Sequence, residues 1–140
     1  MTIMQPQMPG IPLPSATPVS APFWNGCLQR ELLFQRCSSC RAALFNPAWM
    51  CRVCGSTALA WEASTGAGAV YSWTIAHVAS SPDFKVPYAP AIVALDEGFH
   101  IISNIIGCTD KDIRVGLRVR VEFHDVGGGF MLPYFAPDSD

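Results

Sequence analysis

Four cysteines in the first half of the chain have the type and spacing of a metal site. They form two Cys-x-x-Cys pairs separated by ten residues, Cys37 with Cys40 and Cys51 with Cys54. Each pair can present two sulfurs to one point from a tight turn, and four thiolates in a tetrahedron are a common shell for zinc. Gly55, directly after the second pair, supplies the backbone freedom that such a turn requires. The pattern therefore predicts a zinc ribbon with these four cysteines as ligands.

Two other chemistries use the same residue type. A redox dithiol needs one Cys-x-x-Cys at the start of a helix in a βαβ unit, and the sequence offers no such context. A rubredoxin-type iron site uses the same four thiolates and stays an alternative. Because four cysteines fill a tetrahedral shell, no position is left for a substrate, and we expect a structural metal.

The other two cysteines are weak candidates for catalysis. A nucleophilic thiol needs a neighbouring base or a positive field. Cys27 lies in a predicted short helix and Cys108 at the end of a predicted strand, and we expect both to be structural thiols. The sequence has no nucleophile elbow, phosphate-binding loop or dinucleotide-binding glycine pattern. We therefore expect no catalytic residues, and a thiol-based acyltransferase that uses Cys27 or Cys108 stays an alternative.

The elements that position the metal site follow from composition and patterning. Six of the twelve prolines fall within residues 1–22 and prevent regular structure there, so residues 1–21 are expected to form a flexible or extended arm that can lie on a partner. Residues 22–62 are expected to form a short helix and the zinc ribbon. Residues 63–135 are expected to form a barrel, and residues 136–140 a tail.

The second half of the chain has the pattern of a small β-barrel. Apolar or alternating runs are separated by glycine-rich and acidic turns, and Asp96-Glu97-Gly98 is typical of a tight hairpin. The predicted strands are 59–63, 69–78, 91–95, 99–106, 117–124 and 130–135. Because about five barrel strands are too few for a sandwich, we predict a mainly β protein that ends in a small five-stranded barrel.

Composition restricts the class of function and the location. Lys and Arg number 9 against 11 Asp and Glu, a net charge of −2 that disfavours binding through a strong basic field. Charged residues are 14% of the chain, against about 25% in ordinary soluble domains, which suggests a surface covered by a partner. No signal peptide or membrane span is predicted. We expect a cytoplasmic protein, since its cysteines suit a reducing compartment.

The motifs in combination resemble a known family, that of the rubredoxin-like zinc-ribbon plus OB-fold proteins long catalogued as a domain of unknown function. The likeness covers about residues 22–135 and rests on these motifs: Phe23-Trp24, Gln35-Arg36-Cys37-x-x-Cys40, Pro47, Cys51-x-x-Cys54-Gly55, Gly66-x-Gly68-x-Val70-Tyr71-Ser72-Trp73-Thr74, Pro87-Tyr88, Leu95-Asp96-Glu97-Gly98, Asn104 and Val115-Gly116-x-x-Val119.

The resemblance implies that the barrel is an OB-fold. It also implies a non-catalytic subunit that docks on a thiolase-superfamily partner of the sterol-carrier or lipid-transfer type. In such complexes the partner carries out thiolysis, Claisen or retro-aldol chemistry on an acyl-CoA, as in lipid or steroid degradation. The zinc-ribbon and OB-fold chain stabilises the partner and helps to bind the acyl-CoA. A MaoC-type enoyl-CoA hydratase is the alternative partner.

Two sets of residues are candidates for contact with CoA or the partner. Arg36, Arg41 and Arg52 lie in the ribbon, and Phe84, Lys85 and Tyr88 lie in a loop between two barrel strands. Arginine and lysine suit phosphates, and the aromatic rings suit an adenine or a pantetheine chain. A solvated ribbon face and a loop that packs on the partner are the alternative interpretations. Single-stranded nucleic-acid binding by the barrel is a further alternative, disfavoured by the acidic residues among the late barrel cations.

Overall fold

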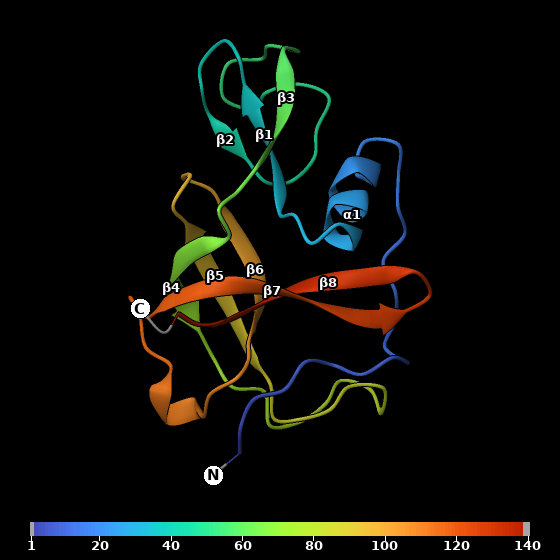
Figure 1. The fold of residues 1–140 in the computed structure, drawn as a ribbon, viewed down its shortest axis with the longest axis vertical. Helices are drawn as coiled ribbons and strands as arrows, with labels where there is room; N and C mark the ends of the chain where they lie inside the picture. Colours follow the sequence, from blue (N-terminus) through green and yellow to red (C-terminus); the bar gives the residue numbers. More distant parts are fainter. Residues whose placement is uncertain (1, 139–140) are drawn as a thin grey trace.

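The computed structural model describes residues 2–138 and divides them between a small sheet and a barrel. Figure 1 shows the sheet at one end of the long axis, the barrel at the other, and the helix beside their junction. The elements are α1 Ala21–Leu28, β1 Leu33–Cys37, β2 Ala43–Leu44, β3 Leu59–Ala63, β4 Ala67–Trp73, β5 Ala89–Leu95, β6 His100–Ile105, the 3₁₀-helix η1 Asp110–Asp112, β7 Arg118–Gly127 and β8 Phe130–Pro137.

The sheet is the ribbon that the cysteine spacing predicts. Its strand order is β2-β1-β3, and both pairings are antiparallel. Helix α1 precedes it and has a proline in its first turn, where the missing N–H is tolerated. A Cβ added at Gly26 would lie 2.8 Å from the side chain of Leu33, so this glycine lets the helix approach β1 closely.

The second half closes into a five-stranded barrel of order β4-β5-β6-β8-β7, which confirms the predicted mainly β architecture. The predicted hairpin at residues 96–98 joins β5 to β6. The expected strand 69–78 ends at Trp73, and beyond it a single bridge pairs Ala76 with Tyr88. Strand β8 continues to Pro137 because its last residues pair with β7.

Gly68 explains how two barrel strands come close together. A Cβ at this position would lie 2.5 Å from the carbonyl oxygen of Ala94 on β5. Any side chain here would force β4 and β5 apart, so the barrel depends on a glycine at this register.

Ribbon and barrel share one core. Phe34 of β1 is fully buried and stacks on Phe99 beside β6, with ring centroids 4.8 Å apart. Phe45, which follows β2, stacks on the same Phe99 ring at 5.6 Å. The carboxylate of Glu97 adds a polar link: it accepts hydrogen bonds from the Ser64 hydroxyl at 2.7 Å and from the Thr65 N–H at 2.8 Å. The ribbon is therefore fixed to the β5–β6 hairpin by aromatic stacking and by this carboxylate.

The proline-rich arm is extended, and it packs on the chain's own barrel. Met4 and Ile11 are buried, with exposed fractions of 2% and 7%. The Met4 N–H donates to the carbonyl of Cys108 at 2.8 Å, and the Met4 carbonyl accepts from the N–H of Gly107 at 2.9 Å. These contacts, between residues about a hundred positions apart, could not be expected from the composition of the arm. Within residues 2–138, no helix has the length and apolar character to cross a membrane.

We expect Phe34→Ala to destabilise the whole molecule. The substitution removes a fully buried ring from the core shared by ribbon and barrel, and such changes cost about 3–5 kcal/mol in the free energy of unfolding. Urea denaturation of the metal-loaded protein measures the loss. Val78→Ala is the control, since Val78 is 85% exposed and its truncation should change stability by about 0.5 kcal/mol or less. Equal stabilities of the two variants would contradict the shared core.

Candidate functional site

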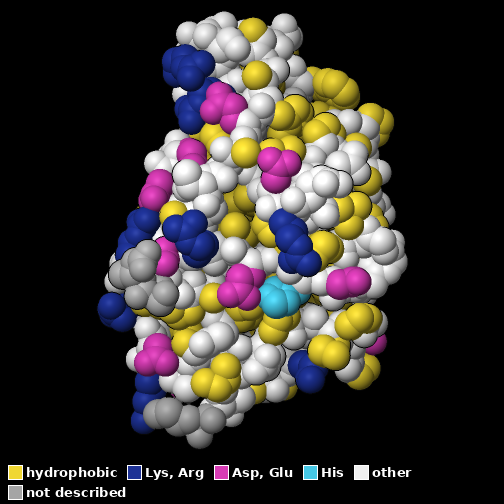
Figure 2. Space-filling model, in the orientation of Figure 1, with side chains coloured by type: hydrophobic (Ala, Val, Ile, Leu, Met, Phe, Trp, Pro, Cys, Tyr) yellow, Lys and Arg dark blue, Asp and Glu magenta, His cyan; other side chains and the backbone are white. Residues whose placement is uncertain are grey.

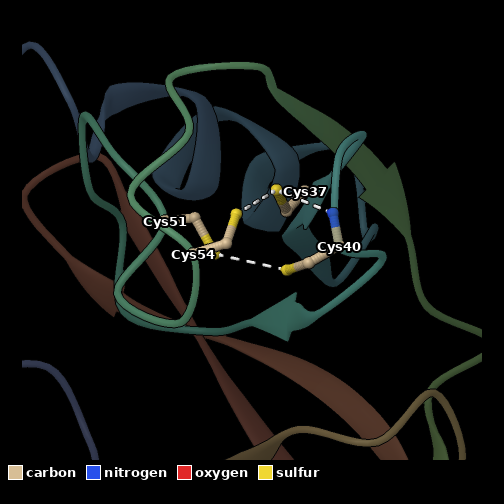
Figure 3. Close-up of side chains that lie close together, drawn as sticks. All are labelled: Cys37, Cys40, Cys51 and Cys54. Carbon is tan, nitrogen blue, oxygen red and sulfur yellow. Dashed lines mark hydrogen bonds between the residues drawn. The ribbon is translucent and has the colours of Figure 1, made fainter.

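The four cysteines of the two Cys-x-x-Cys pairs lie together at the ribbon, with their sulfurs directed at one point (Figure 3). All four Sγ atoms lie within 4.8 Å of one another. The Sγ atoms of Cys37 and Cys54 are 3.6 Å apart, and those of Cys40 and Cys51 are 3.7 Å apart. Zinc–sulfur bonds of about 2.3 Å in a tetrahedron place sulfurs about 3.8 Å apart. The donor set and its spacing therefore suit a structural zinc ion.

Both cysteine turns have the same backbone hydrogen bonds. Arg41, directly after the first pair, donates its N–H to the carbonyl of Cys37 at 2.9 Å, and Gly55 donates in the same way to Cys51 at 2.8 Å. Both residues have positive φ angles, 67° for Arg41 and 80° for Gly55. A left-handed backbone is natural for glycine and strained for arginine. Sequence reasoning identified the glycine and missed its counterpart, because arginine does not signal this conformation.

Backbone N–H groups make two of the sulfurs more acidic. The N–H of Cys40 points at the sulfur of Cys37 from 3.5 Å and lowers the pKa of Cys37 to about 6. The N–H of Cys54 has the largest part in lowering the pKa of Cys51. The N–H of Ala42 acts on Cys40 in the same sense, but lost hydration and the neighbouring sulfurs outweigh it and raise the pKa of Cys40 to about 12. Four adjacent sulfurs ionise together only around a cation, as metal ligands must.

The two remaining cysteines are buried, as expected for structural thiols. Burial raises the pKa of Cys27 to about 12. Burial also raises the pKa of Cys108, and the charge of Asp112 adds to this effect. A nucleophile needs the thiolate form, so neither environment favours acyl transfer by the isolated chain.

A groove of about 530 Å³ lies between the arm, α1, the ribbon and the barrel. Its aromatic walls come from α1, the ribbon, the loop before β5, and β8: Phe23, Trp24, Phe45, Phe84, Tyr88 and Tyr134. No Lys, Arg, Asp or Glu belongs to the described residues that line it. The groove therefore favours uncharged, apolar groups. Its size falls in the range of about 300–1,000 Å³ that is usual for small-molecule sites.

The six candidate contact residues divide into two groups that the structure does not bring together. Arg36, Arg41 and Arg52 lie in the ribbon, whereas Phe84, Lys85 and Tyr88 lie in the loop between β4 and β5, toward the other end of the molecule (Figure 1). A contact with all six requires a ligand or a partner that spans both parts.

Within the ribbon, Arg36 is already engaged. Its side chain pairs with Glu62 at 3.2 Å, donates to the carbonyl of Arg41 at 2.9 Å and covers the ring of Phe34. Arg41 and Arg52 are exposed and carry the positive charge that the ribbon presents to solvent.

In the loop, Phe84 and Tyr88 line the groove with their ring centroids 6.4 Å apart, and the Lys85 side chain is exposed. The backbone of Lys85 is held by Gln7 of the arm, through hydrogen bonds of 2.8 and 3.0 Å to the Gln7 side chain. Nothing in the sequence near Gln7 pointed to this role, because the contact joins residues 78 positions apart.

A second surface feature, also missed by sequence reasoning, is the outer face of β4, β5 and β6. These strands contain no Lys, Arg, Asp or Glu. The face exposes Tyr71 of β4 at 59% and Ile102 of β6 at 79%. The clue lay in strand alternation, which puts Ile102 on the opposite face from the buried Ile101.

By contrast, the face over β7 is charged, and its charges of both signs are interspersed (Figure 2). Arg118 pairs with Asp96 at 2.8 Å, and Arg120 pairs with Asp138 at 3.3 Å. The barrel thus has one polar side with paired ions and one apolar side.

We expect Cys37→Ser to abolish stoichiometric zinc binding and unfold the ribbon. Structural zinc contributes on the order of 10 kcal/mol in modules with little core of their own. Metal analysis by mass spectrometry, together with circular dichroism, measures both effects. Cys27→Ala is the control: it removes a buried thiol outside the site and should keep about one zinc per chain. Iron in place of zinc in the wild-type protein would favour the rubredoxin-type alternative, and unchanged zinc in Cys37→Ser would contradict the ligand assignment.

Two family models match the two parts of the chain in order. Residues 24–60 match the rubredoxin-like zinc ribbon domain of ChsH2, and residues 61–124 match the C-terminal OB-fold domain of ChsH2. The boundary between them falls within β3.

Curated relatives are similar over most of this chain. A probable enoyl-CoA hydratase alpha subunit of Thermomonospora curvata is 32% identical over 126 residues, which are 90% of this chain and 40% of the relative. A DUF35 domain-containing scaffold protein of Methanocaldococcus jannaschii is 32% identical over 74% of this chain and 75% of its own length. A 3-oxo-4,17-pregnadiene-20-carboxyl-CoA hydratase alpha subunit of Mycobacterium tuberculosis is 29% identical over 80% of this chain. The chain spans 40% and 36% of the lengths of the two hydratase subunits.

Solved structures show the same fold. A chain of the Ltp2–ChsH2(DUF35) aldolase superposes with a TM-score of 0.82 at 31% identity, covering 89% of this chain and 98% of that one. A DUF35-family protein of unknown function from Sulfolobus solfataricus gives a TM-score of 0.62 at 16% identity, which supports the fold alone. With both domains matched in order and a relative of similar length at 32% identity, this chain belongs to the ChsH2/DUF35 family of zinc-ribbon and OB-fold proteins.

Proposed function

We propose that this chain is a non-catalytic subunit that docks on a thiolase-superfamily partner of the sterol-carrier or lipid-transfer type. It stabilises that partner and helps to bind an acyl-CoA whose carbon–carbon bond the partner cleaves or forms, by thiolysis, Claisen or retro-aldol chemistry. The similarity to a chain of the Ltp2–ChsH2(DUF35) aldolase supports a carbon–carbon lyase as the partner's activity.

One observation carries the docking part of the proposal, the charge-free outer face of β4, β5 and β6. Tyr71 and Ile102 are exposed on it, and no ion pair on these strands competes with an apolar contact. Buried interface centres are depleted in charge and enriched in aromatic residues. The face therefore has the chemistry of a permanent interface, whereas the β7 side, with its paired ions, is suited to solvent.

The proposed acyl-CoA contacts use both groups of candidate residues. The exposed Arg41 and Arg52 can meet phosphates from the ribbon, and Lys85 can do so from the loop. Phe84 and Tyr88 line the apolar groove and can cover a pantetheine or acyl chain. Arg36 contributes through packing, since Glu62 already neutralises it.

A hydratase partner is the second candidate function. The relatives named as hydratase alpha subunits are more than twice as long as their matched part, so this chain corresponds to one portion of each. The proposed partner in this case is a hydratase of the MaoC type. The nucleic-acid alternative loses support because Arg118 and Arg120 of the barrel already form ion pairs with Asp96 and Asp138. Binding to a phosphate backbone relies on unpaired positive charge.

We expect Ile102→Asp to prevent capture of the catalytic partner. A carboxylate in the middle of an apolar interface must be desolvated, and losses at such central positions reach about 2 kcal/mol or more, or roughly 30-fold in affinity. The test isolates the tagged protein gently from its own cells, identifies what co-purifies in stoichiometric amount and assays the complex for acyl-CoA cleavage. Val115→Asp is the control, because Val115 is 68% exposed but lies in the turn before β7, outside strands β4, β5 and β6.

Each result distinguishes the proposals. A stoichiometric thiolase- or aldolase-type protein, lost with Ile102→Asp and kept with Val115→Asp, supports docking through this face. A MaoC-type hydratase in its place supports the second candidate. Recovery of the wild-type chain alone or with nucleic acid contradicts both. Equal capture by the two variants contradicts the assignment of the face.

A further inference from the structure

We propose that the N-terminal arm is a strap that closes one side of the apolar groove, with Gln7 as a positioning residue that holds the aromatic loop. The aromatic loop is residues 81–88, which carry Phe84 and Tyr88. The arm then determines how firmly the groove retains a small, uncharged, apolar ligand. This inference concerns the chain itself and does not depend on the identity of its partner.

The arm is anchored to the barrel on both sides of Gln7. Before it, the backbone of Met4 exchanges two hydrogen bonds with the segment after β6, donating to Cys108 and accepting from Gly107. After it, Pro9 and Leu13 lie over the glycine turn between β7 and β8, where a Cβ at Gly128 would overlap the Leu13 side chain. A segment fixed at both ends, with its prolines restricting φ, is held in one path across the surface.

Between these anchors, Gln7 joins the arm to the aromatic loop. Its side chain is 5% exposed, and both ends of its amide are used. The Oε1 atom accepts from the N–H of Lys85 at 2.8 Å, and Nε2 donates to the carbonyl of Lys85 at 3.0 Å. The Gln7 N–H donates in turn to the hydroxyl of Tyr134 at 3.2 Å. The Gln7 side-chain amide thus makes the two backbone hydrogen bonds with Lys85 that a neighbouring strand would make in a sheet. Lys85 itself lies in a loop, outside the named strands.

Several residues around the Gln7–Lys85 hydrogen bonds also line the groove. Gln7 and Ile11 of the arm line it, together with Phe84 and Tyr88 of the loop and Tyr134 of β8. Removing the two Gln7–Lys85 hydrogen bonds therefore changes the groove in two ways. The arm is held less firmly along the groove, and the loop that carries Phe84 and Tyr88 loses the contact that fixes its backbone. Since the described lining carries no Lys, Arg, Asp or Glu, the group retained there is apolar and uncharged.

The strap lies outside the two regions that the family models match. These regions are residues 24–60 and 61–124, so neither includes Met4, Gln7 or Ile11. The zinc ribbon and the barrel do not by themselves imply that the groove is closed by an N-terminal segment.

The experiment compares the wild-type chain with Gln7→Met, which keeps a similar side-chain volume but removes both hydrogen bonds to Lys85. Hydrogen exchange of the Lys85 amide should become about tenfold faster or more, because its acceptor is lost. Exchange in β7 and β8 should not change. Met8→Ala is the control, since Met8 is the next residue in the arm and is 57% exposed.

The second measurement uses Nile red, a neutral apolar fluorophore, as the probe for the groove. We expect saturable binding by the wild-type chain and by Met8→Ala. We expect at least fivefold weaker binding by Gln7→Met and by Phe84→Ala, which removes an aromatic wall of the groove.

Unchanged exchange at Lys85, or unchanged Nile red affinity in Gln7→Met, would overturn the proposal. Faster exchange throughout β7 and β8 would also overturn it, since the arm would then be part of the core. Capture of the catalytic partner is a separate readout, so failure of the strap and failure of the proposed function are distinguishable.

Discussion

The ribbon has almost no apolar core of its own, and this constraint governs the rest of the structure. Its buried cluster, among the described residues, is Cys37, Leu44 and Cys51. Two of these three side chains belong to the tetrathiolate set, so packing alone cannot hold the two cysteine turns. A structural zinc ion would supply the missing cross-link, and the four sulfurs have the spacing that it requires. It would also hold the turns that carry the exposed Arg41 and Arg52.

The ribbon also depends on the barrel, and the groove is a product of that dependence. Phe34 and Phe45 reach from the ribbon to Phe99, so the two parts share one aromatic cluster. The same Phe45 also lines the groove, which lies between the arm, α1, the ribbon and the barrel. A change that separates ribbon from barrel would therefore remove both the metal module's support and the apolar site. A groove made at such a junction requires neither module to contain a pocket of its own.

Charge is distributed so that the barrel has two different sides. On β7, arginines are neutralised by Asp96 and Asp138, and this side is compatible with solvent. On β4, β5 and β6, charged residues are absent and Ile102 is exposed. An apolar side of this kind is stable in a complex and a liability in a free monomer, which agrees with the low charged fraction of the whole chain.

The sequence by itself determined the metal site, the short helix, the hairpin at residues 96–98 and the small barrel. Each of these depends on neighbours a few residues apart: cysteine spacing, strand alternation and turn residues are local signals. Only the tertiary structure decided that Arg36 is paired with Glu62, that β8 extends along β7, and that Gln7 holds Lys85. These contacts join residues far apart in the chain, and the free energy that selects them comes from burial and hydrogen bonding in the assembled fold. No local pattern of polarity or spacing records such contacts, so the groove and its strap emerge only when the arm, ribbon and barrel come together.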